Sequence, residues 1–163
     1  MLDSNGMVRT AYSLLLTVVV LFGGLSSASG QSEDEEAVKK LVETFLIAVG
    51  DGDLNALPGM FAANANIGTA SLRDGSWVAS TMTFEKWLKS LEAEVTWTRF
   101  REPVTKFTVH VEDAQMAFVR ADATVFVDEQ ALSHNIDNFT LVREDGTWKF
   151  LSASYIAKPI ASD

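Results

Sequence analysis

FLIAVGDGDLNALPGMF, residues 45–61, is the stretch that decides the fold of this chain. Its first half completes an apolar helical pattern, which Gly50 and Gly52 interrupt, and a second short apolar pattern runs on to Phe61. Glycine adopts the left-handed backbone at which helices commonly end, and Asp53 is a favourable first residue for a following helix. The stretch therefore predicts two consecutive helices that form one wall of a pocket.

Two further helical patterns lie on either side of this stretch. Upstream, apolar residues recur three or four positions apart at Val38, Leu41, Val42, Phe45, Leu46 and Val49. Ser32 followed by Glu35 fits a capping box, so we expect the first helix to begin there. Downstream, Thr83 can cap a third helix, which carries Phe84, Trp87, Leu88 and Leu91.

The rest of the chain has the sequence pattern of β-strands separated by turns. We expect strands at residues 65–72, 77–79, 95–111, 115–127, 132–143 and 147–156. The aspartate-glycine pair at 145–146 is a strong hairpin signal between the last two strands. Helices followed by long meandering strands predict an α+β domain, namely a cone-shaped, curved, mostly antiparallel sheet with three N-terminal helices enclosing a pocket.

The first thirty residues differ from the remainder. Arg9 precedes the apolar run 14–22, and small residues follow up to Gly30, which is the order of a secretory signal peptide. We therefore expect residues 1–30 to be a signal peptide cleaved after Ala28 or Gly30, and residues 31–163 to be a single exported domain, periplasmic or secreted. The alternative is an uncleaved N-terminal anchor, although the apolar run is shorter than the roughly 20 residues that a membrane span needs.

Composition excludes several classes of function. The formal net charge is −9, so the chain lacks the basic surface that binds nucleic acid or an anionic membrane. There is no cysteine, and His110 and His134 have no partner at metal-ligand spacing. Gly50-Asp51-Gly52 is a helix terminator rather than a phosphate-binding loop. We expect neither a metal nor a cofactor.

Several of these segments together resemble a known family. Gly52-Asp53-Leu54, Phe61-Ala62 and the closing segment DNFTLVREDGTWKF, residues 137–150, resemble the SnoaL-like group of the nuclear transport factor 2-like superfamily. The resemblance covers about residues 33–157 and implies a cone fold with an internal pocket. Members of that superfamily include isomerases, cyclases, dehydratases, hydrolases and non-catalytic binding modules, so the fold does not decide the activity.

The ketosteroid isomerase branch of the superfamily allows a test by residue. The resemblance places that branch's oxyanion-hole tyrosine at Phe45, its general base at Thr69 and its protonated aspartate at Asp137. Phe45 has no hydroxyl group, and Thr69 is a poor base near neutral pH, so steroid isomerisation by that mechanism is not expected. Asp137 remains the leading polar candidate, because burial in an apolar pocket would raise the pKa of its carboxyl group.

Alternation along the strand at 115–127 leaves two orientations open. Either its polar residues line the pocket while Val119, Ala121, Ala123 and Val125 form the outer face, or the reverse holds. Arg120, Asp122 and Asp137 would suit a catalytic constellation, and the same three residues could equally form a structural ion-pair network. We expect the ligand to be bound by Phe45, Phe61, Thr69, Trp77, Trp97, Asn135 and Phe139.

Three functions remain open on the sequence. The first is an exported domain that binds a small apolar or aromatic molecule, with no reaction assigned. The second is an isomerase, cyclase, dehydratase or hydrolase that uses Asp137. The third is a dimerisation or association module in which two copies pair through the outer sheet face.

Overall fold

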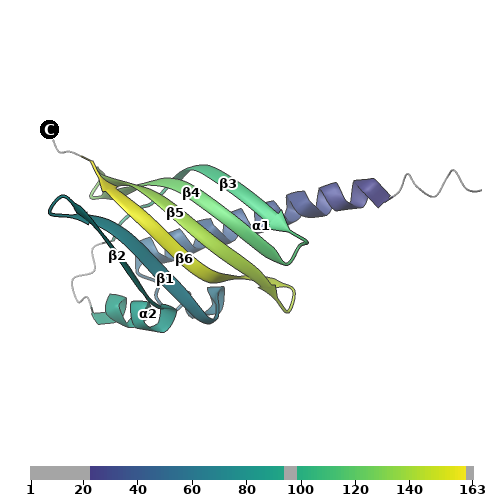
Figure 1. The fold of residues 1–163 in the computed structure, drawn as a ribbon, viewed down its shortest axis with the longest axis horizontal. Coiled ribbons are helices and arrows are strands. Elements are labelled where there is room, and N and C mark those ends of the chain that lie inside the picture. The colour runs from purple at the N-terminus through teal and green to yellow at the C-terminus, as the bar shows by residue number, and fades with distance from the viewer. Residues whose placement is uncertain (1–22, 94–98, 161–163) are drawn as a thin grey trace, which may run out of the picture.

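The computed structural model describes residues 23–93 and 99–160 (Figure 1). In chain order, the elements are α1 (Gly23–Asp51), the short 3-10 helix η1 (Pro58–Met60), β1 (Phe61–Arg73), β2 (Ser76–Thr83), α2 (Phe84–Ala93), β3 (Val104–Glu112), β4 (Met116–Val127), β5 (Gln130–Glu144) and β6 (Thr147–Pro159).

The six strands form one curved sheet in the order β2-β1-β6-β5-β4-β3. Only the β1–β6 pair is parallel, and the other neighbours are antiparallel. In Figure 1, α1 crosses behind β3 to β6, and α2 lies at the open end of the β1–β2 hairpin, away from its turn. The prediction of an α+β domain with a curved, mostly antiparallel sheet is confirmed.

The glycine break ends α1 as expected. Gly52 has a φ of 72°, and its N–H donates to the carbonyl of Val49 at 3.2 Å. The N–H of Asp53 donates to the carbonyl of Ala48 at 2.9 Å. These two hydrogen bonds define a Schellman motif, in which a left-handed glycine satisfies the last carbonyls of a helix. The helix thereby stops sharply, and the chain turns toward the sheet.

The two helices predicted around this break differ from the observed ones. The helix expected to follow Asp53 is reduced to the single 3-10 turn η1, because Pro58 and Gly59 favour a turn and Phe61 already pairs with Phe150 as the first residue of β1. The first helix begins at Gly23 rather than Ser32, and the stretch between them contains no proline that would stop it. The third helix starts as predicted, with the N–H of Lys86 donating to the hydroxyl of Thr83 at 3.3 Å.

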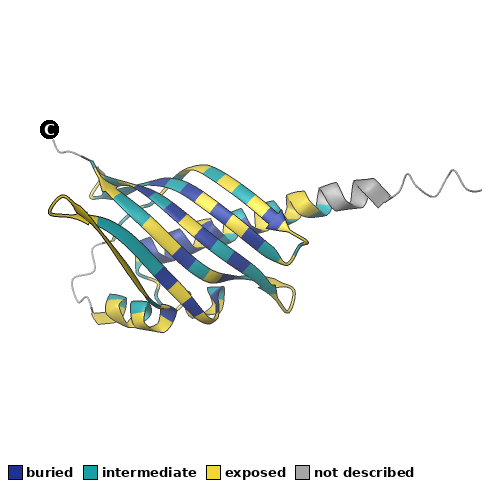
Figure 2. Cartoon of the chain, in the orientation of Figure 1, coloured by how far each residue is buried: buried dark blue, intermediate teal, exposed yellow. Residues whose placement is uncertain are grey.

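Alternation places one face of each central strand against α1. On β4, Ala117, Val119, Ala121 and Ala123 are buried, whereas Phe118 and Arg120 are exposed (Figure 2). Of the two orientations that the sequence left open, the one with the small apolar set on an outer pairing face is therefore contradicted, and the reverse is observed. Small side chains lie on the inner face because they let the helix pack close to the sheet. A homodimer stays a prediction. It was based on an apolar outer face of β4, which the structure does not have.

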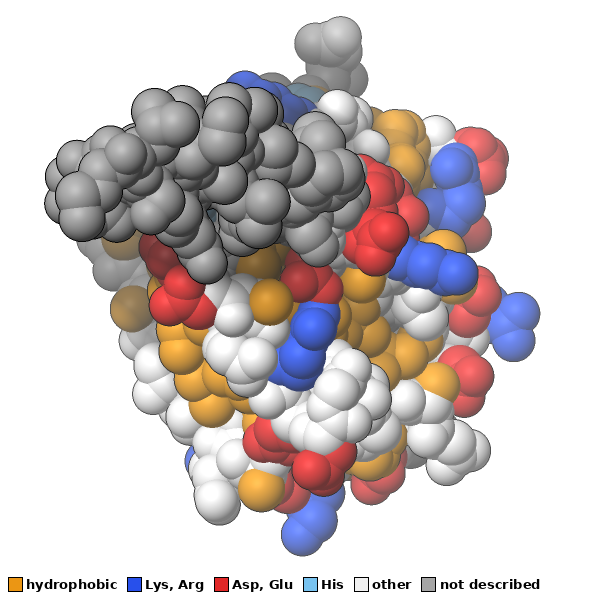
Figure 3. All heavy atoms as spheres, turned by 90° about the vertical axis from the view of Figure 1, so that its right-hand side faces the viewer, with side chains coloured by type: hydrophobic (Ala, Val, Ile, Leu, Met, Phe, Trp, Pro, Cys, Tyr) orange, Lys and Arg blue, Asp and Glu red, His pale blue; other side chains and the backbone are white. Residues whose placement is uncertain are grey.

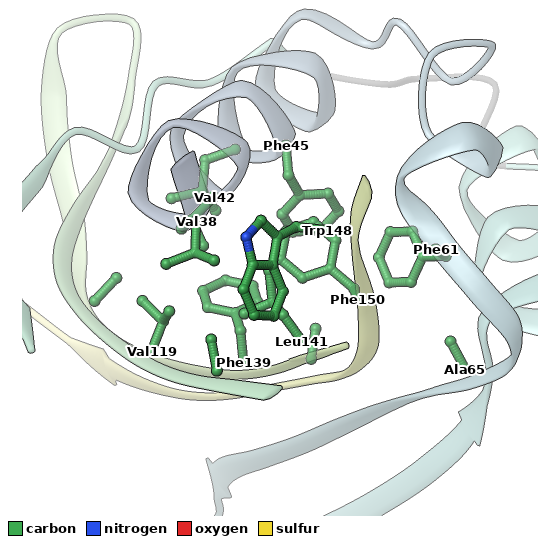
Figure 4. Packing of buried hydrophobic residues seen from close by; sticks show 14 of the residues in the cluster. Val38, Val42, Phe45, Phe61, Ala65, Val119, Phe139, Leu141, Trp148 and Phe150 are labelled. Carbon is green, nitrogen blue, oxygen red and sulfur yellow. The ribbon is translucent and has the colours of Figure 1, made fainter. Parts of the chain in front are cut away.

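The core lies between α1 and this inner face (Figure 4). Val38, Val42 and Phe45 point from α1 toward the sheet, where Leu141 and Phe150 are fully buried. Each such side chain contributes roughly 1.5–3 kcal/mol by its removal from water. The apolar residues at helical spacing in the sequence are therefore the ones that α1 packs against the sheet.

The strand predicted from residue 95 begins later, at Val104. Residues 94–98 lie outside the described part of the chain, and residues 99–103 run along the cavity wall, where Arg101 makes an isolated bridge to Phe126. Neither helix in the described ranges combines the length and apolarity needed to cross a membrane. On the face seen in Figure 3, acidic and basic side chains are interspersed with apolar ones.

Candidate functional site

A cavity of about 200 Å³ lies between the end of α1, α2, the segment before β3 and the inner face of the sheet. Its lining is mostly apolar: Phe45, Leu46, Val49, Ile67, Trp87, Leu91, Phe100, Glu102, Val125, Asn135, Asp137, Phe139, Ala153, Ser154 and Tyr155. No lysine, arginine or histidine lines it among the described residues. Typical pockets for drug-sized ligands measure about 300–1,000 Å³, so this one suits a smaller molecule.

Aromatic rings form the inner wall of the cavity. The ring centroid of Phe45 lies 6.1 Å from Trp87 and 5.9 Å from Phe139, with the Phe139 ring close to perpendicular. Phe150 supports Phe45 from behind at 5.2 Å. Such packed aromatic pairs hold flat, apolar surfaces in fixed orientations. The wall therefore offers preformed surface for a planar ligand.

Asp137 is the most deeply buried acidic group of the cavity. It lies in the middle of β5, opposite Tyr155 of β6 and Ala121 of β4, and its side chain is on the inner face. It is only 5% exposed, and its Oδ2 atom has no hydrogen-bond partner among the described residues. Burial, followed by the negative charges of Glu102 and Asp122, raises the pKa of Asp137 to about 8. The carboxyl group is therefore mostly protonated at neutral pH.

Glu102 is a second acid on the same wall, and the sequence reasoning missed it. Asn135 donates its Nδ2 hydrogen to Glu102 Oε1 at 2.6 Å and accepts from Ser133 Oγ at 2.9 Å. Burial raises the pKa of Glu102, while the hydrogen bond from Asn135 opposes that shift. The available signal was Pro103, which cannot donate to a strand ladder and marks Glu102 as the end of an irregular segment.

Gly50 positions this segment against α1. Its carbonyl accepts a hydrogen bond from the N–H of Phe100 at 3.1 Å. A Cβ atom at Gly50 would lie 2.4 Å from the carbonyl oxygen of Phe100, so only glycine allows this approach. The first glycine of the break thus places Phe100 and Glu102 at the cavity, and the second ends the helix.

The structure brings part of the predicted site together. Phe45, Asn135, Asp137 and Phe139 line the cavity. Phe61 lies outside the lining, because its ring stacks on Phe84 at 4.0 Å.

Two more predicted ligand contacts also fall outside the lining, and a third lies beyond the described residues. Thr69 shares a hydrogen bond with Ser80 at 2.9 Å between β1 and β2. Trp77 is 56% exposed on the β1–β2 hairpin. Trp97 is one of the residues that the structure does not describe.

Arg120 and Asp122 do not join Asp137 in the cavity. They lie on the outer face of β4, where Arg120 Nη2 donates to Asp122 Oδ1 at 2.7 Å. This hydrogen bond lowers the pKa of Asp122. The orientation with the polar residues outside is therefore the observed one, and the pair is a surface ion pair.

The described residues contain no group of three or more histidine, aspartate or glutamate side chains placed to hold a metal ion. The cavity instead combines an apolar, aromatic surface with two acids of raised pKa. Chemically, such a site can orient a flat molecule and donate or accept a proton at Asp137.

Solved structures with the same fold include proteins from several bacteria. A Mycobacterium tuberculosis protein of unknown function has a TM-score of 0.66 at 14% identity, covering 86% of this chain and 79% of that one. A Novosphingobium aromaticivorans protein described as "Putative Scytalone Dehydratase" has a TM-score of 0.63 at 14% identity, covering 80% and 88%.

A dioxygenase component shows the same likeness. The beta subunit of a "putative aromatic-ring-hydroxylating dioxygenase" from Novosphingobium aromaticivorans has a TM-score of 0.64 at 13% identity, covering 83% of this chain and 94% of that chain. At these identities the likeness shows the fold alone, which is the nuclear transport factor 2-like, or cystatin-like, fold.

Sequence comparison adds the family. No curated protein matches the chain. One family model, described as "Putative lumazine-binding", matches residues 33–156, which include α1 from Glu33 onward, strands β1 to β5 and most of β6. The chain belongs to this family.

Proposed function

We propose that this protein is an exported domain that binds a small, flat, apolar or aromatic molecule in the cavity between α1 and the inner sheet face. The observation that carries the proposal is the aromatic wall of Phe45, Trp87 and Phe139 around a cavity of about 200 Å³. The description of the family supports a flat heteroaromatic ligand, since lumazine is a planar bicyclic ring. The finer assignment to the SnoaL-like group is part of the same proposal.

Export rests on the sequence of residues 1–30, with a basic residue, an apolar run and small residues in order. The arrangement of α1 is compatible with it. Among the α1 side chains that the structure describes, which begin at residue 30, the first with a hydrogen-bond partner on another element is Asp34, which lies beyond both expected cleavage positions, Ala28 and Gly30.

A matched pair of substitutions on α1 tests where the ligand binds. Lumazine serves as the probe, and its dissociation constant is measured by quenching of tryptophan fluorescence. Phe45→Arg should abolish binding, because the charged side chain would occupy the aromatic wall. Ile47→Arg, at a position 64% exposed on the same helix, should leave the affinity unchanged. Equal binding by both variants would place the ligand elsewhere.

An acid–base enzyme is the second candidate, because Asp137 and Glu102 face the same cavity and both have a raised pKa. Such acids can transfer protons near neutral pH, and a structural neighbour described as a scytalone dehydratase gives a substrate to try. Turnover of scytalone that Asp137→Asn abolishes and Asp122→Asn preserves would favour the enzyme. Absence of turnover, together with lumazine binding, would favour the binding domain.

A further inference from the structure

In the described lining of the cavity, Asp137 carries a buried oxygen without a hydrogen-bond partner. Asn135 already uses both ends of its amide, donating to Glu102 and accepting from Ser133. Asp137 lies two residues further along β5, on the same inner face, and only 5% of its surface is exposed. Its Oδ2 atom has no hydrogen-bond partner among the described residues. A buried polar atom without a partner is costly, so its presence in a native structure needs an explanation, such as a bound molecule that supplies the missing hydrogen bond.

The charges around Asp137 determine whether its carboxyl group is protonated. The titratable groups that face or act on Asp137 are Glu102 from the segment before β3, Asp122 from β4 and Tyr155 from β6. Among the described residues, the parts of α1 and α2 that line the cavity contribute apolar and aromatic side chains. Because no described cation lines the cavity, the carboxyl group is neutral near pH 7, in agreement with its raised pKa.

A neutral carboxylic acid has a particular hydrogen-bonding pattern. It presents an O–H donor beside a C=O acceptor. The complementary edge on a ligand is a C=O acceptor beside an N–H donor, as in a cyclic lactam or imide. Such an edge forms two parallel hydrogen bonds with the acid. A carboxylate or phosphate ligand would instead meet Glu102 and no described counter-charge.

We propose that the cavity recognises a planar heterocycle through a lactam edge, a ring N–H next to a ring C=O, which pairs with the carboxyl group of Asp137. This inference rests on the proposed binding function and specifies its ligand class. The aromatic wall supplies the surface against which the flat ring lies, and the cavity volume limits the ligand to one or two rings. Phe45 and Phe139 favour a flat ligand, and Asp137 favours a ligand with a lactam edge.

Two probes that differ only at this edge test the inference. Lumazine carries ring N–H groups beside carbonyl groups, and the derivative with both ring N–H groups methylated does not. Calorimetric titration at pH 6 should show that the wild-type protein binds lumazine at least tenfold more tightly than the methylated derivative. Equal affinities would overturn the lactam edge but leave the binding function standing. Failure of both probes to bind would overturn both proposals.

Variants at Asp137 separate recognition from folding. Asp137→Asn keeps a donor beside an acceptor and should retain the preference for lumazine, whereas Asp137→Leu should bind both probes alike. Asp122→Asn, on the outer face, is the matched control and should behave as wild type. Thermal unfolding of each variant confirms that it is folded. A preference for lumazine that persists in folded Asp137→Leu protein would assign the recognition to another group.

Discussion

Asp137 couples the stability of the fold to pH. Its pKa rises from 3.8 to about 8 on folding, because burial and neighbouring negative charge disfavour the ionised form. Between these two values the folded protein holds a proton that the unfolded chain has released. The free energy of unfolding should therefore fall as pH rises from about 4 to about 8, by at most about 1.4 kcal/mol for each pH unit.

The substitution Asp137→Asn should flatten this dependence, because the amide does not ionise. We expect the variant to exceed the wild-type protein in stability at pH 8 and to lose that advantage toward pH 5, as measured by urea unfolding. Asp122→Asn should retain nearly the wild-type slope, since the pKa of Asp122 is lowered rather than raised. A flat wild-type curve between pH 5 and pH 8 would show that Asp137 is not a buried neutral acid.

A second residue-scale prediction concerns the contact between α1 and the β5–β6 hairpin. Arg143 pairs with Asp34, lies 4.7 Å over the Trp148 ring, and has a buried Nε atom without a partner in the described part of the chain. Removing one partner of a buried ion pair leaves the other uncompensated. Arg143→Met should therefore lower the free energy of unfolding by about 3 kcal/mol, toward the lower end of the range for such pairs because Arg143 keeps some exposure.

Denaturant unfolding of Arg143→Met beside Arg120→Met gives the comparison. Arg120 forms an exposed pair with Asp122, and exposed pairs contribute little to stability. Replacing the charged pair by an apolar pair, in the double substitution Asp34→Leu, Arg143→Met, should recover part of the stability that Arg143→Met loses. Equal effects of the two arginine substitutions would mean that the Asp34 contact is not a buried pair in solution.

At the scale of the element, the glycine break separates two roles that the sequence could not distinguish. Gly52 is needed for its positive φ, whereas Gly50 is needed for the close approach of Phe100. Gly50→Ala should displace the segment that carries Glu102 and weaken lumazine binding about tenfold. It should also cost about 1–3 kcal/mol of stability, as overpacking typically does.

The control for this substitution is Gly59→Ala. A Cβ atom at Gly59 meets nothing within 4 Å, so the variant should bind lumazine like the wild-type protein. Calorimetric titration measures both affinities. If Gly50→Ala binds normally, the segment before β3 does not shape the cavity.

Periodicity predicted the elements better than it predicted the site. Helix spacing placed Phe45 on the apolar face of the first helix, but the resemblance to the ketosteroid isomerase branch is what singled out Phe45 and Asp137 as site residues. The alternation on β4 could not show which face is inner, since that depends on which side α1 packs. Glu102 was expected inside a strand at residues 95–111, whereas long-range hydrogen bonds of Phe100 with Gly50 and of Arg101 with Phe126 hold its segment at the cavity.

The misplaced residues have equally physical causes. Phe61 was expected at the pocket because a second helix was expected to carry it. The observed strand instead turns its ring onto Phe84. Trp77 and Thr69 belong to the β1–β2 hairpin, whose distance from the helix end depends on how far the whole sheet curves. Such long-range geometry is not encoded in any short stretch of residues.

At the scale of the molecule, α1 has an anchored part and a projecting part. In Figure 1 the N-terminal end of the helix extends past the edge of the sheet. Among its described side chains, Asp34 is the first that forms hydrogen bonds to another element, to Arg143 and Trp148, and Val38 is the first that is fully buried. Removal of the chain before residue 31 should therefore leave the domain intact.

Two truncated proteins test this division of α1. A chain that starts at Gln31 should unfold with nearly the same free energy as the full-length protein, because it keeps Asp34 and all the α1 side chains of the described core. A chain that starts at Ala37 keeps Val38 but loses Asp34, which leaves Arg143 uncompensated, and it should lose about 3 kcal/mol. Urea unfolding of both measures the difference. Unfolding of the chain that starts at Gln31 would show that the projecting turns are part of the fold, and cleavage after Ala28 or Gly30 would then be incompatible with a stable exported domain.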